Sequence, residues 1–505
     1  MCAAAYAEAV KRGTSMKKQE YLNKINETIA KGKYKDSWAS LSQYEVPKWY
    51  KDAKFGIFIH WGVYSVPAFG SEWYSRNMYI QGSKEYKHHI KTYGKHKDFG
   101  YKDFIPMFKA EKFNADEWAK LFKDAGAQYA VPVAEHHDGF QMYKSENSKW
   151  NAYEMGPHRD VLGELTESFK KYGIENGASS HRVEHWFFMG HGKEFESDIT
   201  DAEQEGDFYY PAMPEADHHD IYSRPIPTKE FLEDWLIRCC EIVDRFAPRV
   251  VYFDWWIQHN AVKPYLKKFA AYYYNRAEER GYEGVITYKH DAFMFGTAVV
   301  DIERGQLADA KPYVWQTDTA VAKNSWCYTE GNEYKNAVDL VQDLVDIVSK
   351  NGRMLLNIGP RADGSIPKED EHILREIGKW LKVNGEAIYG TKLWRYSDEG
   401  DTKVKEGQFA DNESKGYTSK DIRFTVKGNA LYATVLKYPE DGKVTITRLA
   451  KADASKLPVF SGIIRDVSVL GYTERPKFKR DGEGLHVVTE TVKSEYPVVF
   501  KIELD

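Results

Sequence analysis

Short apolar runs that end in His, Trp, Asp or Glu recur along this chain. They cover residues 55–61, 129–138, 178–186 and 250–256. Strands that are buried on both faces form unbroken apolar runs of this kind, and a barrel of parallel strands gathers its catalytic side chains at the carboxyl ends of several strands. The pattern therefore predicts a barrel with one shared site at the ends of its strands.

Amphipathic segments alternate with these runs. Residues 115–126 and 160–173 stand before the second and third runs, and both end on Gly, the preferred residue at a helix C-cap. A third helix is expected over residues 229–246. Strands that alternate with helices of this length indicate βαβ units and a parallel sheet. We therefore predict the α/β class and a (β/α)8-like, TIM-type barrel, regular or irregular.

The texture of the chain changes after Trp394. Before this point, Val and Leu stripe one face of residues 338–348, the apolar run 354–358 follows, and a last helix is expected at about 368–384. Beyond it, short β-branched runs are separated by Gly, Asp and Asn, which is typical of a small all-β sandwich. The predicted domains are an N-terminal arm or helix over residues 1–45, a catalytic barrel over 46–394 and a C-terminal β-sandwich over 395–505.

Composition excludes several classes of function. The 505 residues carry a formal net charge of −5, with a pI near 6.4. Because this charge gives no basic field and no apolar stretch is long enough to cross a bilayer, we expect neither nucleic acid nor a membrane as partner.

The start of the chain has the small residues of a cleavage site but lacks the charged and long apolar regions of a signal peptide, so localisation stays open. The sequence also leaves open whether the protein forms a homo-oligomer.

Asp254 is the leading candidate for catalysis. It stands at the tip of Val250-Val-Tyr-Phe253, with Trp255 and Trp256 behind it, where a barrel presents a nucleophile and aromatic rings exclude water. Carboxylates are the nucleophiles of many glycosidases. The alternative is that Asp254 only caps the following turn.

Other polar residues near aromatic rings suit a sugar. Aromatic residues make up 15% of the chain, and their faces stack on the apolar C–H face of a sugar ring. The pairs His60-Trp61 and Glu72-Trp73 each combine a polar group with a ring. His136 and His137 are adjacent, so on a strand tip they point to opposite sides and suit hydrogen bonds to hydroxyls; structural histidines are the alternative. Residues 190–225 are expected to form a long solvated loop over the site.

A metal has little support in the sequence. His181-Arg-Val-Glu184-His185 fits the H-x-x-E-H spacing of inverted zincins, but that chemistry needs a helix that brings both imidazoles onto one face. Here the motif follows Gly177-Ala-Ser-Ser180, which reads as a strand end. The four cysteines show no CxxC spacing, so we expect free thiols. We expect no metal and no cofactor, and a zinc peptidase remains an alternative function.

With these residues assembled, the chain resembles the α-L-fucosidases of glycoside hydrolase family 29, from about residue 45 to residue 505. The resemblance implies a retaining exo-glycosidase that removes terminal α-L-fucose from fucosylated glycans, with an Asp nucleophile, a carboxylic acid/base and no metal. It rests on residues 49–67, which include Phe55-Gly-Ile-Phe-Ile-His60-Trp61-Gly62, and on Glu72-Trp-Tyr74, Glu135-His-His-Asp-Gly-Phe140, His158-Arg-Asp-Val161, Phe253-Asp254 and Asn351-Gly-Arg-Met-Leu-Leu-Asn-Ile-Gly-Pro360 with its continuation to Pro367.

The resemblance also implies roles for single residues. Asp254 would be the nucleophile. Tyr252 stands where the family often has Trp, and Arg304 matches a substrate-binding Arg of the family. The expected substrate-binding residues are His60, Trp61, Glu72, Trp73, His136, His137, Tyr252, Arg304 and Trp326.

One departure from the family pattern concerns the proton donor. Many members carry the acid/base Glu in a Trp-Glu dipeptide, whereas here Trp315 is followed by Gln316, which cannot donate a proton as a carboxylic acid does. We expect a neighbouring carboxyl to replace it, and Glu303, which follows an apolar run, is our choice. Asp318 and Glu184 are the alternatives. A lost acid/base would instead leave a fucose-binding, lectin-like protein on an inactive barrel.

Overall fold

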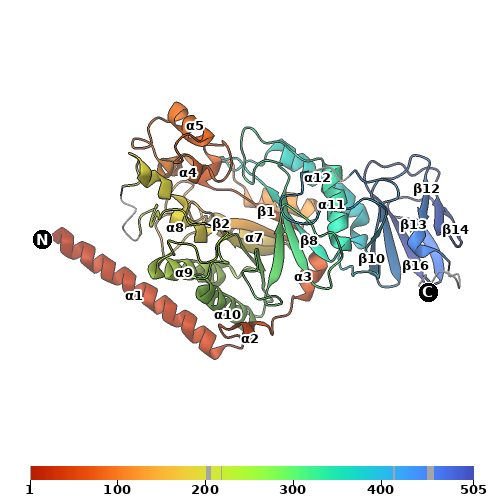
Figure 1. The fold of residues 1–505 in the computed structure, drawn as a ribbon, viewed down its shortest axis with the longest axis horizontal. Helices are drawn as coiled ribbons and strands as arrows, with labels where there is room; N and C mark the ends of the chain where they lie inside the picture. Colours follow the sequence, from red (N-terminus) through yellow and green to blue (C-terminus); the bar gives the residue numbers. More distant parts are fainter. Residues whose placement is uncertain (1, 201–205, 218, 413–415, 452–459) are drawn as a thin grey trace.

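The computed structural model describes residues 2–200, 206–217, 219–412, 416–451 and 460–505. Eight parallel strands follow one another in chain order and close into a barrel, in which β1 pairs with both β2 and β8 (Figure 1). The predicted (β/α)8-like barrel is confirmed. The strands are β1 (Phe55–Ile59), β2 (Tyr129–Glu135), β3 (Glu175–Ser180), β4 (Val250–Phe253), β5 (Val285–Tyr288), β6 (Val299–Glu303), β7 (Trp315–Ala320) and β8 (Gly352–Ile358).

Helices follow most of these strands on the outside of the barrel. Their ends have the expected chemistry: the Asp160 side chain accepts from the Gly163 N–H at the start of α7, and Gly173, at a φ of 65°, caps its end. In the described chain no helix joins β5 to β6 or β6 to β7, so the barrel is irregular. The barrel helices are α6 (Ala115–Asp124), α7 (Val161–Tyr172), α9 (Lys229–Phe246), α10 (Lys263–Glu279), α11 (Ala337–Ser349) and α12 (Lys368–Asn384).

Long insertions after β1 and β3 build up the mouth of the barrel. The second insertion includes the expected solvated loop, but Ile199, Phe208 and Tyr209 in it are buried, because they pack against the first insertion and the barrel. The prediction that this loop is solvated was therefore wrong for these three residues. The insertions contain the α-helices α4 (Tyr74–Asn77), α5 (Lys84–Thr92) and α8 (His185–Phe188). They also contain the 3-10 helices η1 (Val63–Ser65), η2 (Tyr101–Met107), η3 (Arg182–Glu184) and η4 (Gly190–Glu194).

The N-terminal segment lies along the barrel helices. Ile25 and Ile29 on α1 are buried in the barrel's outer core, and the Tyr21 hydroxyl donates to Asp244 on α9 at 2.7 Å. No helix of the described residues combines the length and apolar character needed to cross a bilayer. The helices of this segment are α1 (Cys2–Lys31), α2 (Trp38–Leu41) and α3 (Lys48–Ala53).

The C-terminal region is all-β, as predicted. A five-stranded sheet in the order β13-β16-β11-β10-β9 and a three-stranded sheet in the order β12-β15-β14 enclose a second apolar core (Figure 1, blue). The buried pair of Arg423 on β10 and Asp346 on α11 ties this region to the barrel. The 3-10 helix η5 (Gly385–Ala387) follows α12 and precedes this region. The elements of the region are β9 (Asp398–Glu399), β10 (Ile422–Lys427), β11 (Ala430–Val435), β12 (Lys443–Ile446), the 3-10 helix η6 (Thr447–Leu449), β13 (Ile464–Val469), β14 (Lys477–Arg480), β15 (Leu485–Val488) and β16 (Val498–Leu504).

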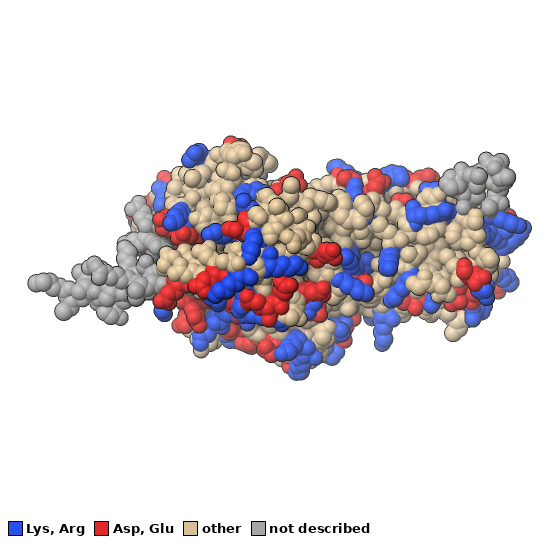
Figure 2. All heavy atoms as spheres, turned by 90° about the horizontal axis from the view of Figure 1, so that it is seen from below, with Lys and Arg blue, Asp and Glu red and all other residues tan. Residues whose placement is uncertain are grey.

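The face of the molecule in Figure 2 is covered by neither basic nor acidic side chains alone. Basic and acidic side chains are interspersed there over the barrel helices. Cys239, Cys240 and Cys327 are buried free thiols, as expected from their spacing.

Candidate active site

The carboxyl ends of the barrel strands open into a cavity of about 430 Å³. Each strand turns its last side chains inward, so residues far apart in sequence meet there. The polar ends of the apolar runs predict this convergence. The cavity-lining residues that follow or end strands are His60, His136, His137, His181, Asp254 and Glu303, and Asp318 lines the cavity from within β7.

Asp254 is held in its ionised form. His181 Nδ1 donates a hydrogen bond to Asp254 Oδ2 at 2.8 Å, and His137 Nε2 lies 3.6 Å from the same oxygen. Burial alone would raise the pKa of Asp254, but the hydrogen bond from His181 and the charge of Lys289 hold this pKa well below its usual range. An ionised carboxylate in a buried site is what a nucleophile requires.

Glu303 has the opposite electrostatic environment. Burial raises the pKa of Glu303 to about 7, and the negative charge of Asp254 adds to this, although Lys289 acts against it. Lys289 Nζ lies 2.9 Å from Glu303 Oε2 and 3.0 Å from Asp318 Oδ2. The indole N–H of Trp255 also donates to Glu303. At neutral pH Glu303 therefore carries its proton in a large share of molecules, as a general acid must.

The two alternative carboxyls differ in their surroundings. Asp318 accepts from the Tyr252 hydroxyl at 2.6 Å and is paired with Lys289, so its oxygens are already engaged. Glu184 is fully buried in the cavity wall, and its pKa is raised well above the usual range by burial and by the charges of Asp254 and Glu303. Glu184 is thus the second group at this site that can keep a proton.

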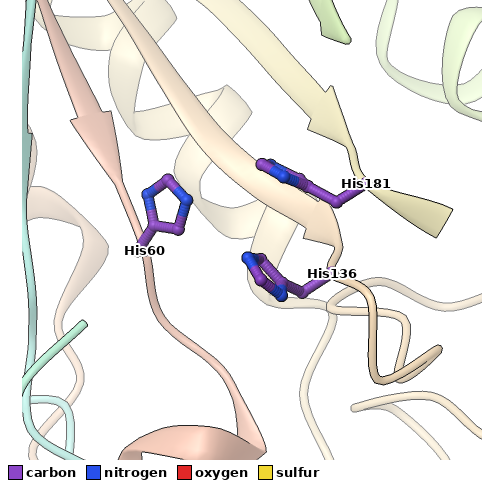
Figure 3. A group of neighbouring side chains, drawn as sticks. All are labelled: His60, His136 and His181. Atoms are coloured by element: carbon purple, nitrogen blue, oxygen red, sulfur yellow. The ribbon is translucent and has the colours of Figure 1, made fainter. Parts of the chain in front are cut away.

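Three histidines form one wall of the cavity. Figure 3 shows the rings of His60, His136 and His181 facing one another from the ends of three neighbouring strands. His60 Nδ1 lies 2.7 Å from Asn357 Oδ1 on β8, which fixes its ring. Burial, together with the neighbouring imidazoles, lowers the pKa of His60 and His136 well below the usual value. The rings of His60 and His136 are therefore neutral, and since His60 Nδ1 donates to Asn357, its Nε2 is left to accept from a hydroxyl group.

The same rings could also hold a metal ion. One nitrogen each of His60, His136 and His181 lie within 4.8 Å of one another, and one atom each of His137, His181 and Asp254 do likewise. Among the described residues these are the two groups with such geometry. The expectation that the site works without a metal stays a prediction.

The H-x-x-E-H segment does not form a zinc site of the zincin kind. His181 directly follows β3, caps the start of η3 and donates to Asp254, whereas His185 starts α8. The two ring nitrogens of His185 lie 2.8 Å from the His137 carbonyl and 2.9 Å from the Phe208 carbonyl. Since both nitrogens face carbonyl oxygens, His185 is a structural residue, and the peptidase alternative loses its ligand.

Glu72, Trp73 and Trp326 line the cavity as expected, together with Tyr252. Glu72 Oε2 accepts from the Trp326 backbone N–H at 3.1 Å, so the insertion after β1 and the loop after β7 brace each other. Burial raises the pKa of Glu72. Glu72, Trp73 and Trp326 form an aromatic and polar part of the cavity wall. Because they come from two loops far apart in the sequence, their spacing along the chain does not show that they lie together.

Two expected substrate-binding residues lie outside the cavity lining. The Trp61 indole donates to the Arg361 carbonyl at 2.7 Å, and its ring packs among Phe108, Phe113 and Trp118 in the core. The residue after a strand-end His points to the other side, which buries it.

Arg304 is the second of these residues. Its guanidinium donates to the carbonyls of Ala322, Lys323 and Ser325, and it lies 4.5 Å from the centre of the Trp326 ring. Arg304 therefore supports the loop that carries Trp326, and its role in binding the substrate stays a prediction.

Comparisons with known proteins agree with this geometry. A family model described as Alpha-L-fucosidase matches residues 21–386, and one described as Alpha-L-fucosidase C-terminal domain matches residues 415–503. The chain belongs to the α-L-fucosidases of glycoside hydrolase family 29. It is 32% identical to the tissue α-L-fucosidase of Rattus norvegicus over 442 residues, which are 85% of this chain and 84% of the rat protein.

Other relatives cover similar spans. The plasma α-L-fucosidase of Homo sapiens is 33% identical over 427 residues, which are 82% of this chain and 80% of the human protein. The solved structure of the Thermotoga maritima α-fucosidase in complex with fucose has a TM-score of 0.71 and 30% identity, and covers 93% of this chain and 100% of the bacterial one. The likeness therefore includes both the barrel and the C-terminal region.

Gln316, the apparent departure from the fucosidase pattern, lies inside the barrel and away from the cavity. Its amide accepts from the hydroxyls of Tyr50 at 2.7 Å and Tyr129 at 2.9 Å and donates to Asp301 at 2.6 Å. The side chain is fully buried. Position 316 therefore belongs to the packed barrel interior, and its amide gives no support to an inactive barrel.

Sequence reasoning missed several residues of this fucosidase site. Lys289 directly follows β5, and its signal was a basic residue after the run Val285-Ile-Thr-Tyr288. Arg76 and Glu215 form an ion pair at the cavity wall from the two insertions, and no local pattern marks them. The other missed lining residues are Phe187, Trp255, Trp256 and Phe409, of which the two Trp were noted only as neighbours of Asp254.

Proposed function

We propose that the protein is a retaining, exo-acting α-L-fucosidase that hydrolyses terminal α-L-fucose from fucosylated glycans by double displacement. The observation that carries the proposal is the contrast between Asp254, whose pKa is held low, and Glu303, whose pKa is raised to about 7, in one cavity. Two carboxyl groups whose environments separate their pKa values are the mark of a nucleophile and an acid. Membership of the fucosidase family supports the choice of sugar.

In the first step Asp254 attacks the anomeric carbon, while Glu303 gives its proton to the departing oxygen. A covalent fucosyl ester on Asp254 results, and the leaving group departs as a neutral alcohol. In the second step the Glu303 carboxylate removes a proton from water, which attacks the same carbon and releases Asp254. The two inversions together retain the α configuration.

The remaining lining residues suit a sugar ring. The neutral His60 can accept from a hydroxyl at Nε2, the neutral His136 can also bind a hydroxyl, and Trp73 and Trp326 offer apolar faces to ring C–H groups. His181 does not contact the sugar in this scheme but orients the Asp254 carboxylate. The cavity is closed below by the packed barrel, so only a terminal sugar can enter.

The test is hydrolysis of an aryl α-L-fucoside, followed by NMR of the product as it forms. We expect α-L-fucose to appear first and the β anomer only later by mutarotation. An aryl α-D-galactoside, whose sugar belongs to the D series whereas the fucose is an L sugar, serves as the control and should not be cleaved. Initial release of the β anomer would contradict the retaining scheme, and no cleavage of any fucoside would overturn the activity itself.

A further inference from the structure

A segment that follows the barrel returns to the strand that carries Glu303. The N–H of Phe409 donates to the Glu303 carbonyl at 3.0 Å, that of Ala410 to the Arg304 carbonyl at 2.8 Å, and that of Gly407 to the Gln306 carbonyl at 3.1 Å. These backbone bonds run along the end of β6. They place residues 407–410 directly beside the proposed proton donor.

The next residue anchors this segment to the barrel. The Asp411 carboxylate is buried and accepts from Lys335 and from the Thr319 hydroxyl on β7. Its oxygen also lies 3.8 Å from the Arg304 guanidinium. Because both ends of the segment are bonded to the barrel, the position of Phe409 is fixed.

Phe409 is an unusual residue at this position. Its φ of 56° lies in the left-handed region, where a bulky side chain is strained, and 58% of its surface is exposed. Neither feature helps the fold, since the ring is not part of a core. The ring nevertheless lines the cavity. Strain and exposure at a cavity residue point to a role in binding.

Trp255 forms the other half of the same surface. The Phe409 and Trp255 rings lie 6.0 Å apart, with 35° between their planes, and Trp255 itself donates to the Glu303 carboxylate. Phe409 is thus hydrogen-bonded to the backbone carbonyl of Glu303, and Trp255 is hydrogen-bonded to its carboxylate. The pair flanks the group that must protonate the glycosidic oxygen.

We propose that Phe409 and Trp255 form the binding surface for the sugar to which fucose is attached. This inference rests on the proposed fucosidase function. The oxygen that Glu303 protonates is bonded to the leaving group, so the leaving group must lie next to Glu303. Two aromatic faces there fit the apolar C–H face of a pyranose ring. The substrate class is therefore fucose linked to a hexose or an N-acetylhexosamine, rather than fucose on a serine or threonine hydroxyl.

The test compares two substrates that differ only in the leaving group. A fucosyl disaccharide has a pyranose leaving group, whereas α-L-fucosyl fluoride has a leaving group too small to reach the two rings and releases fluoride without a proton donor. We expect Phe409→Ala to lower kcat/KM for the disaccharide about tenfold, the size of one ring contact, mainly through KM. Its kcat/KM for fucosyl fluoride should stay within about twofold of the unaltered protein.

Matched variants separate binding from structure. Phe409→Tyr keeps the ring and should restore turnover of the disaccharide. Phe478→Ala removes another exposed Phe, on β14 of the C-terminal region, and should change neither substrate. Equal loss on both substrates, or no loss on either, would overturn the proposal. If the unaltered protein cleaves neither fucoside, the proposed function itself fails, which is a distinct result.

Discussion

At the scale of residues, the site depends on two carboxyl groups that lose their protons at different pH. In the proposed mechanism Glu303 must be protonated for the first step, and its pKa is raised to about 7 by burial and by the charge of Asp254, with Lys289 opposing. Asp254 must be ionised, and its pKa lies well below the usual range. The active form therefore exists between these two pKa values.

The pH dependence follows from this difference. The value of kcat/KM should fall as the pH rises through about 7, because Glu303 loses its proton, and should fall on the acidic side only below the usual pKa of an Asp. Initial rates on a fucosyl disaccharide, whose poor leaving group needs the proton, measure both limbs between about pH 3 and about pH 9. A rate that climbs steadily through neutral pH would contradict the assignment.

The proton donor itself can be identified by its dependence on the leaving group. A general acid matters most for a poor leaving group, so Glu303→Gln should reduce cleavage of a fucosyl disaccharide strongly while sparing an activated aryl fucoside and fucosyl fluoride. Glu184→Gln and Asp318→Asn are the matched controls, since both carboxyls line the same cavity. If one of them shows the leaving-group-dependent loss and Glu303→Gln does not, the donor has been misplaced.

At the scale of elements, the strand ends explain what could and could not be predicted. The apolar runs at β1, β2, β4 and β8 were recognised because all their residues are buried, whereas β3 was recognised only from Ala178 on, since Glu175 and Asn176 are polar and half-buried. β7 has the sequence Trp315-Gln-Thr-Asp-Thr-Ala320, whose polar side chains are all buried, so its pattern conceals a strand. Gln316 and Asp318 point inward in successive layers, because side chains alternate along a strand. Only Asp318 reaches the cavity, and the spacing along the sequence does not show which of the two residues lies nearer to it.

Lys289, at the end of β5, should control both stability and pH dependence. Lys289→Met removes the cation that Glu303 and Asp318 share, so these buried carboxyls repel each other and the free energy of unfolding should fall by about 3 kcal/mol. The pKa of Glu303 should rise further, which moves the basic limb of the activity profile to higher pH. Lys335→Met, which breaks a buried pair with Asp411, should cost stability without moving that limb. An unmoved limb in Lys289→Met would contradict the assignment.

The histidines at the ends of β1, β2 and β3 are expected to act without a metal. Dialysis against EDTA should leave fucosidase activity intact, because the neutral His60 and His136 can bind hydroxyls directly and, in the proposed mechanism, Asp254 and Glu303 supply the chemistry. Metal analysis of the dialysed protein is the accompanying measurement. Loss of activity that zinc restores would show that His60, His136 and His181 hold an ion.

At the scale of the whole molecule, the two cores and the order of their elements could be predicted, but the connection between them could not. The alternation of apolar runs and amphipathic helices identified the barrel, and the short β-branched runs identified the C-terminal sheets. The return of residues 407–410 to β6 depends on backbone hydrogen bonds, which carry no side-chain signal. Phe409 reaches the cavity from this connection, and Arg76 and Glu215 reach it from the insertions after β1 and β3, so sequence patterns did not find them.

The most direct test of the central claim is to trap the fucosyl-enzyme intermediate with a 2-deoxy-2-fluoro-fucosyl fluoride. The fluorine at C2 slows both steps, and the good leaving group allows the ester to form and accumulate. Mass spectrometry of the proteolysed protein should place the fluorofucosyl group on Asp254, and Asp254→Asn should give no adduct. Attachment to Glu303, Asp318 or Glu184, or turnover without any covalent adduct, would contradict the account.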